Sequence, residues 1–121
     1  MPPSTSDHRV VLQSLRGILV VPMPDPLSQG FMLDLNAQLL QALHAQPSRG
    51  VVLDMTGVQL LDAGDFSLLE SLWKTCKLLG TRLVLAGLQP GTAAALTLLN
   101  VSDHWATAAL SVEHAMEKLG K

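Results

Sequence analysis

Apolar residues change their spacing along the chain, and these changes predict strands that alternate with helices. Unbroken runs of β-branched and aliphatic residues are typical of buried strands, whereas apolar residues that recur every three or four positions are typical of helices. The first two runs are separated by residues 14–17 and predict a hairpin. The predicted strands are 10–12, 18–21, 51–53, 83–86 and, as a weak edge strand, 106–110.

Four segments have the composition or spacing of helices, and three of them are amphipathic. Asp25 or Ser28 can cap the first helix. Asp62 is the natural N-cap of the second, which Gly80 would end in a left-handed conformation. The other predicted features are a turn at 87–91, a third helix at 92–99 and Ser111 as the cap of the fourth helix. The residues predicted to face the core are Phe31, Met32, Leu35, Leu39 and Leu43, then Phe66, Leu69, Trp73 and Cys76, and finally Val112, Ala115, Met116 and Leu119.

This order of elements predicts one α/β domain with a mixed β-sheet. The N-terminal hairpin comes first, parallel strands joined by right-handed crossovers follow, and about four helices cover the sheet. A chain of 121 residues can form one core and is too short for two. Residues 1–8, rich in Pro and Ser, are predicted to be a flexible tail, and residues 9–121 form the domain.

Composition and charge exclude several classes of function. Eight Lys and Arg residues stand against ten Asp and Glu, and the basic residues are scattered, which argues against nucleic-acid binding. Charges, Gly or Pro interrupt every apolar run, so we expect no direct membrane insertion. The first residues lack the basic region and apolar core of a secretory signal, which favours the cytoplasm.

The chemically active residues are few and dispersed. Cys76 is the only cysteine, which excludes an intrachain disulfide and a cysteine-based metal cluster. The four histidines lack zinc-ligand spacing, and the chain has neither a P-loop nor a G-x-G-x-x-G motif. No set of residues fills the roles of nucleophile and base together. We therefore expect no metal, no cofactor and no enzymatic activity.

The junction between the third predicted strand and the second helix is the one constellation of polar residues that stands out. Asp62 and Asp65 lie around the first turn of that helix, and Asp54 ends the strand. One interpretation is capping, worth about 1 to 2 kcal/mol. The other is a binding surface, because open α/β sheets place their sites where a strand end leads to a helix N-terminus, and Gly64 would allow close approach.

Five segments at and after this junction carry a resemblance to a known family: Val51-Val52-Leu53-Asp54-Met55-Thr56-Gly57-Val58, Leu61-Asp62, Leu78-Leu79-Gly80, Leu83-Val84-Leu85-Ala86-Gly87 and Leu88-Gln89-Pro90. With them the sequence resembles the STAS domain family, named for sulphate transporters and anti-sigma-factor antagonists. The resemblance covers nearly the whole chain, from about Val10 to Leu119. Within the family, the chain is most similar to the RsbS-like scaffold subunit of the stressosome.

The resemblance implies a non-enzymatic phospho-switch. In the family, an antagonist binds a kinase with a histidine-kinase-type ATPase fold, which phosphorylates the Ser or Thr that directly follows a particular Asp. That Asp is Asp62 here, and the next residue is Ala63, which has no hydroxyl. The implied partners are such a switch kinase, sibling STAS scaffold proteins, or both, together with further copies of the chain. The predicted contact surface is Asp62, Ala63, Gly64 and Asp65, with Thr56 and Gly57 in the adjoining loop.

Several alternatives stay open at this point. Asp65 either caps the helix or supplies a permanent phosphoserine-like charge. Other hydroxyls stand at Thr56, Ser67, Thr92 and Thr97, of which Thr56 and Thr92 lie in or near predicted loops that a kinase could reach. For each of them, ordinary hydrogen bonding is the competing and favoured interpretation. A STAS domain could instead bind a small ligand or nucleotide beside the second helix, or serve as a subunit of a membrane transport system. Trp105 either covers the sheet edge or anchors an oligomer contact.

Overall fold

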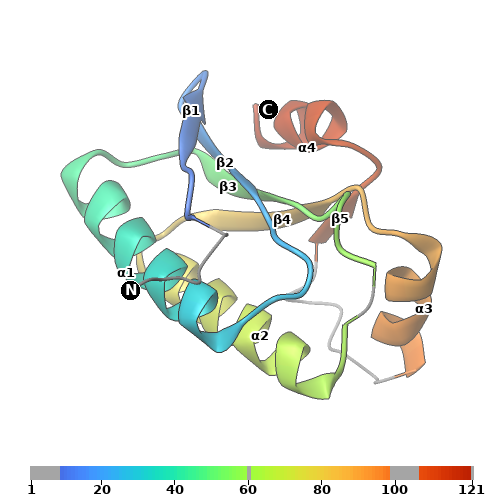
Figure 1. Ribbon diagram of the computed structural model, residues 1–121. Coiled ribbons are helices and arrows are strands. Elements are labelled where there is room, and N and C mark those ends of the chain that lie inside the picture. The colour runs from blue at the N-terminus through green and yellow to red at the C-terminus, as the bar shows by residue number, and fades with distance from the viewer. Residues whose placement is uncertain (1–8, 60, 99–106, 121) are drawn as a thin grey trace.

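The computed structural model describes residues 9–59, 61–98 and 107–120, in which five strands and four helices alternate as predicted (Figure 1). The sheet order is β1-β2-β3-β4-β5, with β1 antiparallel to β2 and the other neighbours parallel. The predicted mixed α/β sheet is therefore confirmed. The elements are β1 (Gln13–Leu15), β2 (Ile18–Pro22), α1 (Gln29–Ala45), β3 (Gly50–Asp54), α2 (Ala63–Leu78), β4 (Arg82–Ala86), α3 (Pro90–Leu98), β5 (Thr107–Ala109) and α4 (Val112–Leu119).

Helices cover both faces of the sheet. α1 and α2 pack side by side on one face, and α4 crosses the other (Figure 1). The side chains of β3 alternate between the two layers: Val51 and Leu53 join the core beneath α1 and α2, and Val52 joins the core beneath α4. All three are fully buried, as the unbroken apolar run predicts for a central parallel strand.

The hairpin is confirmed, but its first strand lies at Gln13–Leu15 and not at the predicted residues 10–12. The turn contains only Arg16 and Gly17, whose φ angles of 53° and 79° are those of a type I′ turn. This tight turn pairs Leu15 with Ile18, so the strand runs right up to the turn. Val10 and Leu12 instead pack, partly buried, against the core beneath α1 and α2.

The helix caps follow the predictions closely, while one helix boundary differs. Ser28 caps α1, where its Oγ accepts a hydrogen bond from the Phe31 N–H at 3.0 Å. Ser111 caps α4 in the same way through the His114 N–H at 3.1 Å. α3 begins at Pro90, two residues before the predicted start. Proline suits the first position of a helix, because the N–H that it lacks would have no partner within the helix there.

α2 buries a slightly different set of residues than predicted. Phe66, Leu69 and Cys76 are buried, but Leu72 takes the remaining core position, and Trp73 is only partly buried. The Lys77 Nζ lies 4.9 Å from the centre of the Trp73 ring. Part of the indole therefore lies at the surface, where the lysine cation is attracted to the face of the ring.

Gly80 ends α2 in the predicted left-handed conformation, with φ of 72°. Its N–H donates to the Lys77 carbonyl at 3.0 Å, and the Thr81 N–H donates to the Cys76 carbonyl at 2.9 Å. These two bonds form a Schellman motif, which satisfies carbonyls that the helix end leaves free.

Burial of Cys76 makes the stability of the fold depend on pH at the alkaline end. Desolvation raises the pKa of this thiol from 9.0 to about 11. The folded state therefore holds the proton more tightly than the unfolded state. This contribution to the free energy of unfolding is lost as the pH rises from 9 towards 11. We expect the free energy of unfolding to fall by about 1.4 kcal/mol per pH unit in this window. Denaturant titrations at several pH values would measure this fall. If the free energy of unfolding of Cys76→Ala falls equally steeply with pH, the Cys76 thiol is not its cause.

Candidate functional site

The start of α2 is fixed by two reciprocal hydrogen bonds. Asp62 Oδ1 accepts from the Asp65 N–H at 2.8 Å, and Asp65 Oδ2 accepts from the Asp62 N–H at 3.0 Å. The Phe66 N–H donates to the Asp62 carbonyl at 3.1 Å and begins the helical ladder. This capping box confirms Asp62 as the N-cap and holds the first turn in one conformation.

The capping box stands at the surface. Asp62, Ala63 and Gly64 are exposed, and Asp65 is half-buried. A Cβ at Gly64 would lie 3.3 Å from Asp62 Oδ1, so glycine leaves room for the capping carboxylate. Each of the two capping hydrogen bonds uses one oxygen of its carboxylate, Oδ1 of Asp62 and Oδ2 of Asp65. The surface is thus acidic, small and rigid, and its chemistry suits a partner with basic or hydrogen-bond-donating groups.

The loop after β3 is tied to the end of that strand by Asp54. One carboxylate oxygen of Asp54 accepts from the Thr56 N–H at 3.1 Å and from the Thr56 hydroxyl at 2.6 Å. Such an Asx turn lets an aspartate stand in for a backbone turn. Met55 and Val58, which flank the exposed Thr56 and Gly57, are fully buried and anchor the loop.

A second loop, after β4, locks onto the first. The Gln89 side-chain amide donates to the Thr56 carbonyl at 2.6 Å. Gly87 has φ of 72°, and a Cβ built on it would lie 2.5 Å from the Thr56 hydroxyl oxygen. Glycine is therefore required at position 87 both by its conformation and by the close approach of Thr56.

The six predicted contact residues thus fall into two clusters at the carboxyl end of the parallel strands. Asp62, Ala63, Gly64 and Asp65 form the capping box, whereas Thr56 and Gly57 belong to the loop that Asp54 and Gln89 hold. No hydrogen bond joins the two clusters within residues 9–59 and 61–98. The support that Gln89 and Gly87 give to this loop was not predicted from the sequence. The turn itself has a recognisable signal, the Asx-turn spacing Asp-x-Thr at residues 54–56.

The alternative hydroxyls differ in how they are held. The Thr92 side chain is 1% exposed and its hydroxyl donates to the Gln59 carbonyl at 3.2 Å. The hydrogen-bonding interpretation is therefore confirmed for Thr92, and access by a kinase is not. Thr56 is exposed, but its hydroxyl is bound to Asp54. Ser67 is exposed and follows Ala63 by one helical turn. Thr97 lies within α3.

A groove in the structure lies away from this region. Residues of β1, β2 and α4 line it, together with Arg49, which precedes β3 and so marks the amino end of the parallel strands. This groove therefore does not coincide with the ligand site that was expected beside α2. Across the described ranges, no three His, Cys, Asp or Glu residues gather to hold a metal ion, and no helix is long and apolar enough to cross a membrane. The predicted roles of the tail and of Trp105 concern residues outside the described ranges.

Comparison with known families now identifies the class of protein. The sequence profile of the STAS domain matches residues 9–115, and the chain therefore belongs to the STAS domain family. A search of curated protein sequences finds no match.

Solved structures share this fold over nearly their whole length. A variant of RsbS from Moorella thermoacetica is 24% identical with a TM-score of 0.79, and the match covers 93% of this chain and 96% of that one. A chain from the stressosome, described as a signal integration and transduction hub, is 22% identical with a TM-score of 0.78 and coverage of 91% and 96%. The unphosphorylated anti-sigma-factor antagonist SpoIIAA is 13% identical with a TM-score of 0.71 and coverage of 93% and 96%. At these identities the likeness establishes the fold.

Proposed function

We propose that this STAS domain is a non-enzymatic interaction module of a bacterial signalling system of the partner-switching or stressosome type. It binds a switch kinase with a histidine-kinase-type ATPase fold, sibling STAS scaffold proteins, or both, in the cytoplasm. Family membership and the likeness to RsbS, stressosome and SpoIIAA chains support this role.

The observation that carries the proposal is the exposed, rigid start of α2 with alanine at the position that the family phosphorylates. Asp62 and Ala63 are both exposed, so a partner can reach them without any opening of the fold. The capping box fixes them in place, which lowers the entropy lost on binding. Because Ala63 has no hydroxyl, a kinase bound here cannot release itself by phosphorylating this position.

Asp65 acts as a cap in this proposal, and not as a substitute for phosphoserine. Its carboxylate accepts from the Asp62 N–H, and its own N–H donates to Asp62. It is also half-buried, whereas Ala63 is exposed. A carboxylate so placed carries one charge that complements the helix dipole, compared with roughly −1.5 to −2 for a phosphate at pH 7. The domain therefore stays in its binding-competent, unphosphorylated state.

Capture of partners from a native lysate tests this function. The tagged domain is used as bait, with and without ATP, and bound proteins are identified by mass spectrometry. We expect an ATPase-fold kinase or other STAS proteins, with no phosphate on residue 63. Capture of transporter subunits alone would instead support the role as a subunit of a membrane transport system, and specific retention of a small ligand or nucleotide without any protein would support the ligand-binding role.

A further inference from the structure

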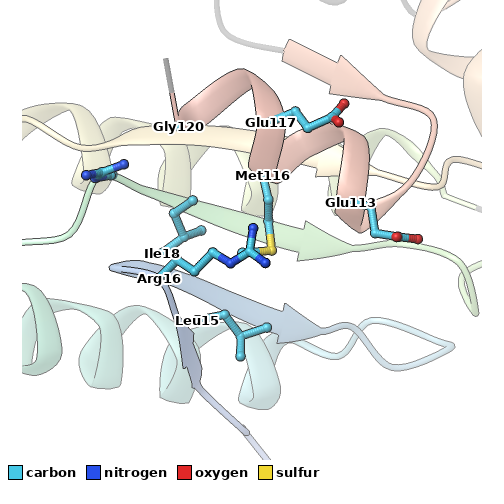
Figure 2. A pocket seen from close by; sticks show the side chains of 8 residues that line it. Leu15, Arg16, Ile18, Glu113, Met116, Glu117 and Gly120 are labelled. Carbon is cyan, nitrogen blue, oxygen red and sulfur yellow. The ribbon is translucent and has the colours of Figure 1, made fainter.

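A groove of about 760 Å³ lies between the β1–β2 hairpin and α4, at the amino end of the parallel strands (Figure 2). Its lining combines apolar side chains with charged side chains of both signs. We propose that this groove binds a short peptide with free ends, a zwitterion with an apolar side chain. The proposal goes beyond the proposed function, because the start of α2 lies at the other end of the strands.

Arg16, which lines this groove, holds an unfavourable backbone conformation. It is the first of the two turn residues, and its φ of 53° is the one positive φ of a residue other than glycine in the described ranges. A type I′ turn favours Asn, Asp or Gly at this position, since these residues tolerate the left-handed region. Strained residues of this kind are concentrated at ligand clamps and active sites. The choice of arginine therefore points to a role of its side chain outside the turn.

The Arg16 side chain is free to meet a ligand. It is exposed, and its guanidinium makes neither a hydrogen bond nor an ion pair within the part of the chain that the structure describes. Figure 2 shows it reaching from the hairpin towards Met116 on α4. The guanidinium of Arg49, which also lines the groove, is likewise unpaired among these residues. Two such guanidiniums match the two oxygens of a carboxylate.

The backbone holds both arginines in place before a ligand arrives. The Gly17 carbonyl accepts from the Arg49 N–H at 2.9 Å and from the Ser48 hydroxyl at 2.8 Å. These bonds tie the hairpin turn to the residues that lead into β3. The arginines therefore stand at the amino ends of two neighbouring strands, whose backbones lie about 5 Å apart. A site on such a frame loses little backbone entropy when it binds.

α4 supplies the negative charges of the groove. Glu113 and Glu117 both line it and stand one helical turn apart on the same side of the helix. Neither carboxylate forms an ion pair with any arginine in residues 9–59, 61–98 and 107–120. The negative side chains of α4 and the positive side chains of the hairpin are thus separate, and each set is available to a ligand.

The distribution of charge and apolar surface defines the ligand. The arginines bind a carboxylate, the glutamates bind an ammonium, and Leu15 and Met116 contact an apolar side chain. A ligand with charges of one sign is attracted by one set of residues and repelled by the other. A peptide with free ends carries both charges and an apolar middle. The volume falls within the range of about 300 to 1,000 Å³ that is usual for small-molecule sites.

Titration with two tripeptides tests the proposal. Alanyl-leucyl-alanine and trialanine differ only in the central side chain, and both carry a free ammonium and a free carboxylate. Binding is followed by NMR through the amide signals of Leu15 and Gly120, which line the groove. We expect saturable binding of alanyl-leucyl-alanine. Trialanine should bind about tenfold more weakly, and so should alanyl-leucyl-alanine with an acetylated amino end or an amidated carboxyl end.

Arg16→Asn separates a role in binding from a role in the fold. Asparagine is favoured at the first position of a type I′ turn, so this variant should unfold at an equal or higher temperature than the wild type. Its peptide binding should nevertheless weaken by about tenfold or more. Glu113→Gln should weaken binding about tenfold as well. Arg82→Gln is the control, because Arg82 is exposed but does not line the groove, and it should bind as the wild type does.

Four results would each overturn the proposal. They are the absence of saturable binding, equal binding of free and doubly blocked alanyl-leucyl-alanine, unchanged binding by Arg16→Asn, and a lower unfolding temperature of that variant. Equal binding of the blocked peptide would indicate an internal segment of a partner protein as the occupant. The lysate capture does not depend on this groove, so the proposed function and this proposal fail separately.

Discussion

A serine at position 63 is expected to convert the domain into a substrate of the proposed partner kinase. Ala63→Ser restores the hydroxyl directly after Asp62, on an exposed first helical turn that the capping box holds in place. We expect phosphate incorporation to rise from background in the wild type to about one per chain, as measured by intact-mass spectrometry after incubation with kinase and ATP. The new phosphate adds roughly −1.5 to −2 charges beside Asp62 and Asp65, so kinase binding should weaken about a hundredfold.

Ala37→Ser is the matched control for this variant. Ala37 is also exposed and helical but lies on α1, away from the start of α2. It should gain no phosphate. Stoichiometric phosphate on the wild type itself, at Ser67 for example, would contradict the claim that the loss of a hydroxyl at position 63 fixes the domain in its unphosphorylated state.

Replacement of Gly87 by alanine is expected to cause a large loss of stability. The left-handed φ of 72° strains any residue with a side chain, and the new Cβ would lie 2.5 Å from the Thr56 hydroxyl oxygen. Together these effects should lower the free energy of unfolding by about 2 to 4 kcal/mol, which corresponds to a drop in Tm of roughly 10 °C. Thermal and denaturant unfolding followed by circular dichroism would measure both quantities.

Gly30→Ala provides the opposite expectation with the same chemical change. Gly30 lies in the first turn of α1, where an added Cβ meets nothing within 4 Å. Alanine is the better helix former, so this variant should be equally stable or up to about 1 kcal/mol more stable. Equal changes in the free energy of unfolding for Gly87→Ala and Gly30→Ala would show that the contact between the two loops does not stabilise the fold.

The parts of the fold that hydrophobic pattern and caps control were predictable from the sequence. The run Val51-Val52-Leu53 and the caps Ser28, Asp62 and Ser111 each depend on neighbours close in sequence, and the structure confirms all of them. The start of β1 was not predictable in this way. Its position depends on Arg16 adopting a positive φ, which is uncommon for a residue other than glycine.

The candidate site was predictable only in part, for a similar reason. The capping box joins residues three apart in the chain, so its spacing is visible in the sequence. The contact of Gln89 with Thr56 joins residues 33 positions apart, and no local pattern reports it. The burial of Thr92 was not predictable in the same way, because its hydroxyl bonds to Gln59, 33 positions away in the chain.

The affinity of the proposed partner kinase for Asp62 variants shows whether the start of α2 is the contact surface. Asp62→Asn keeps an efficient N-cap but removes the charge, and Asp62→Lys reverses the charge and also costs about 1 kcal/mol of capping. Asp34→Lys makes the same charge change at an exposed position of α1 and serves as control. By calorimetry we expect binding to weaken about tenfold for Asp62→Asn and about a hundredfold for Asp62→Lys, with the control unchanged. Undiminished binding by both Asp62 variants would show that the start of α2 is not the contact surface.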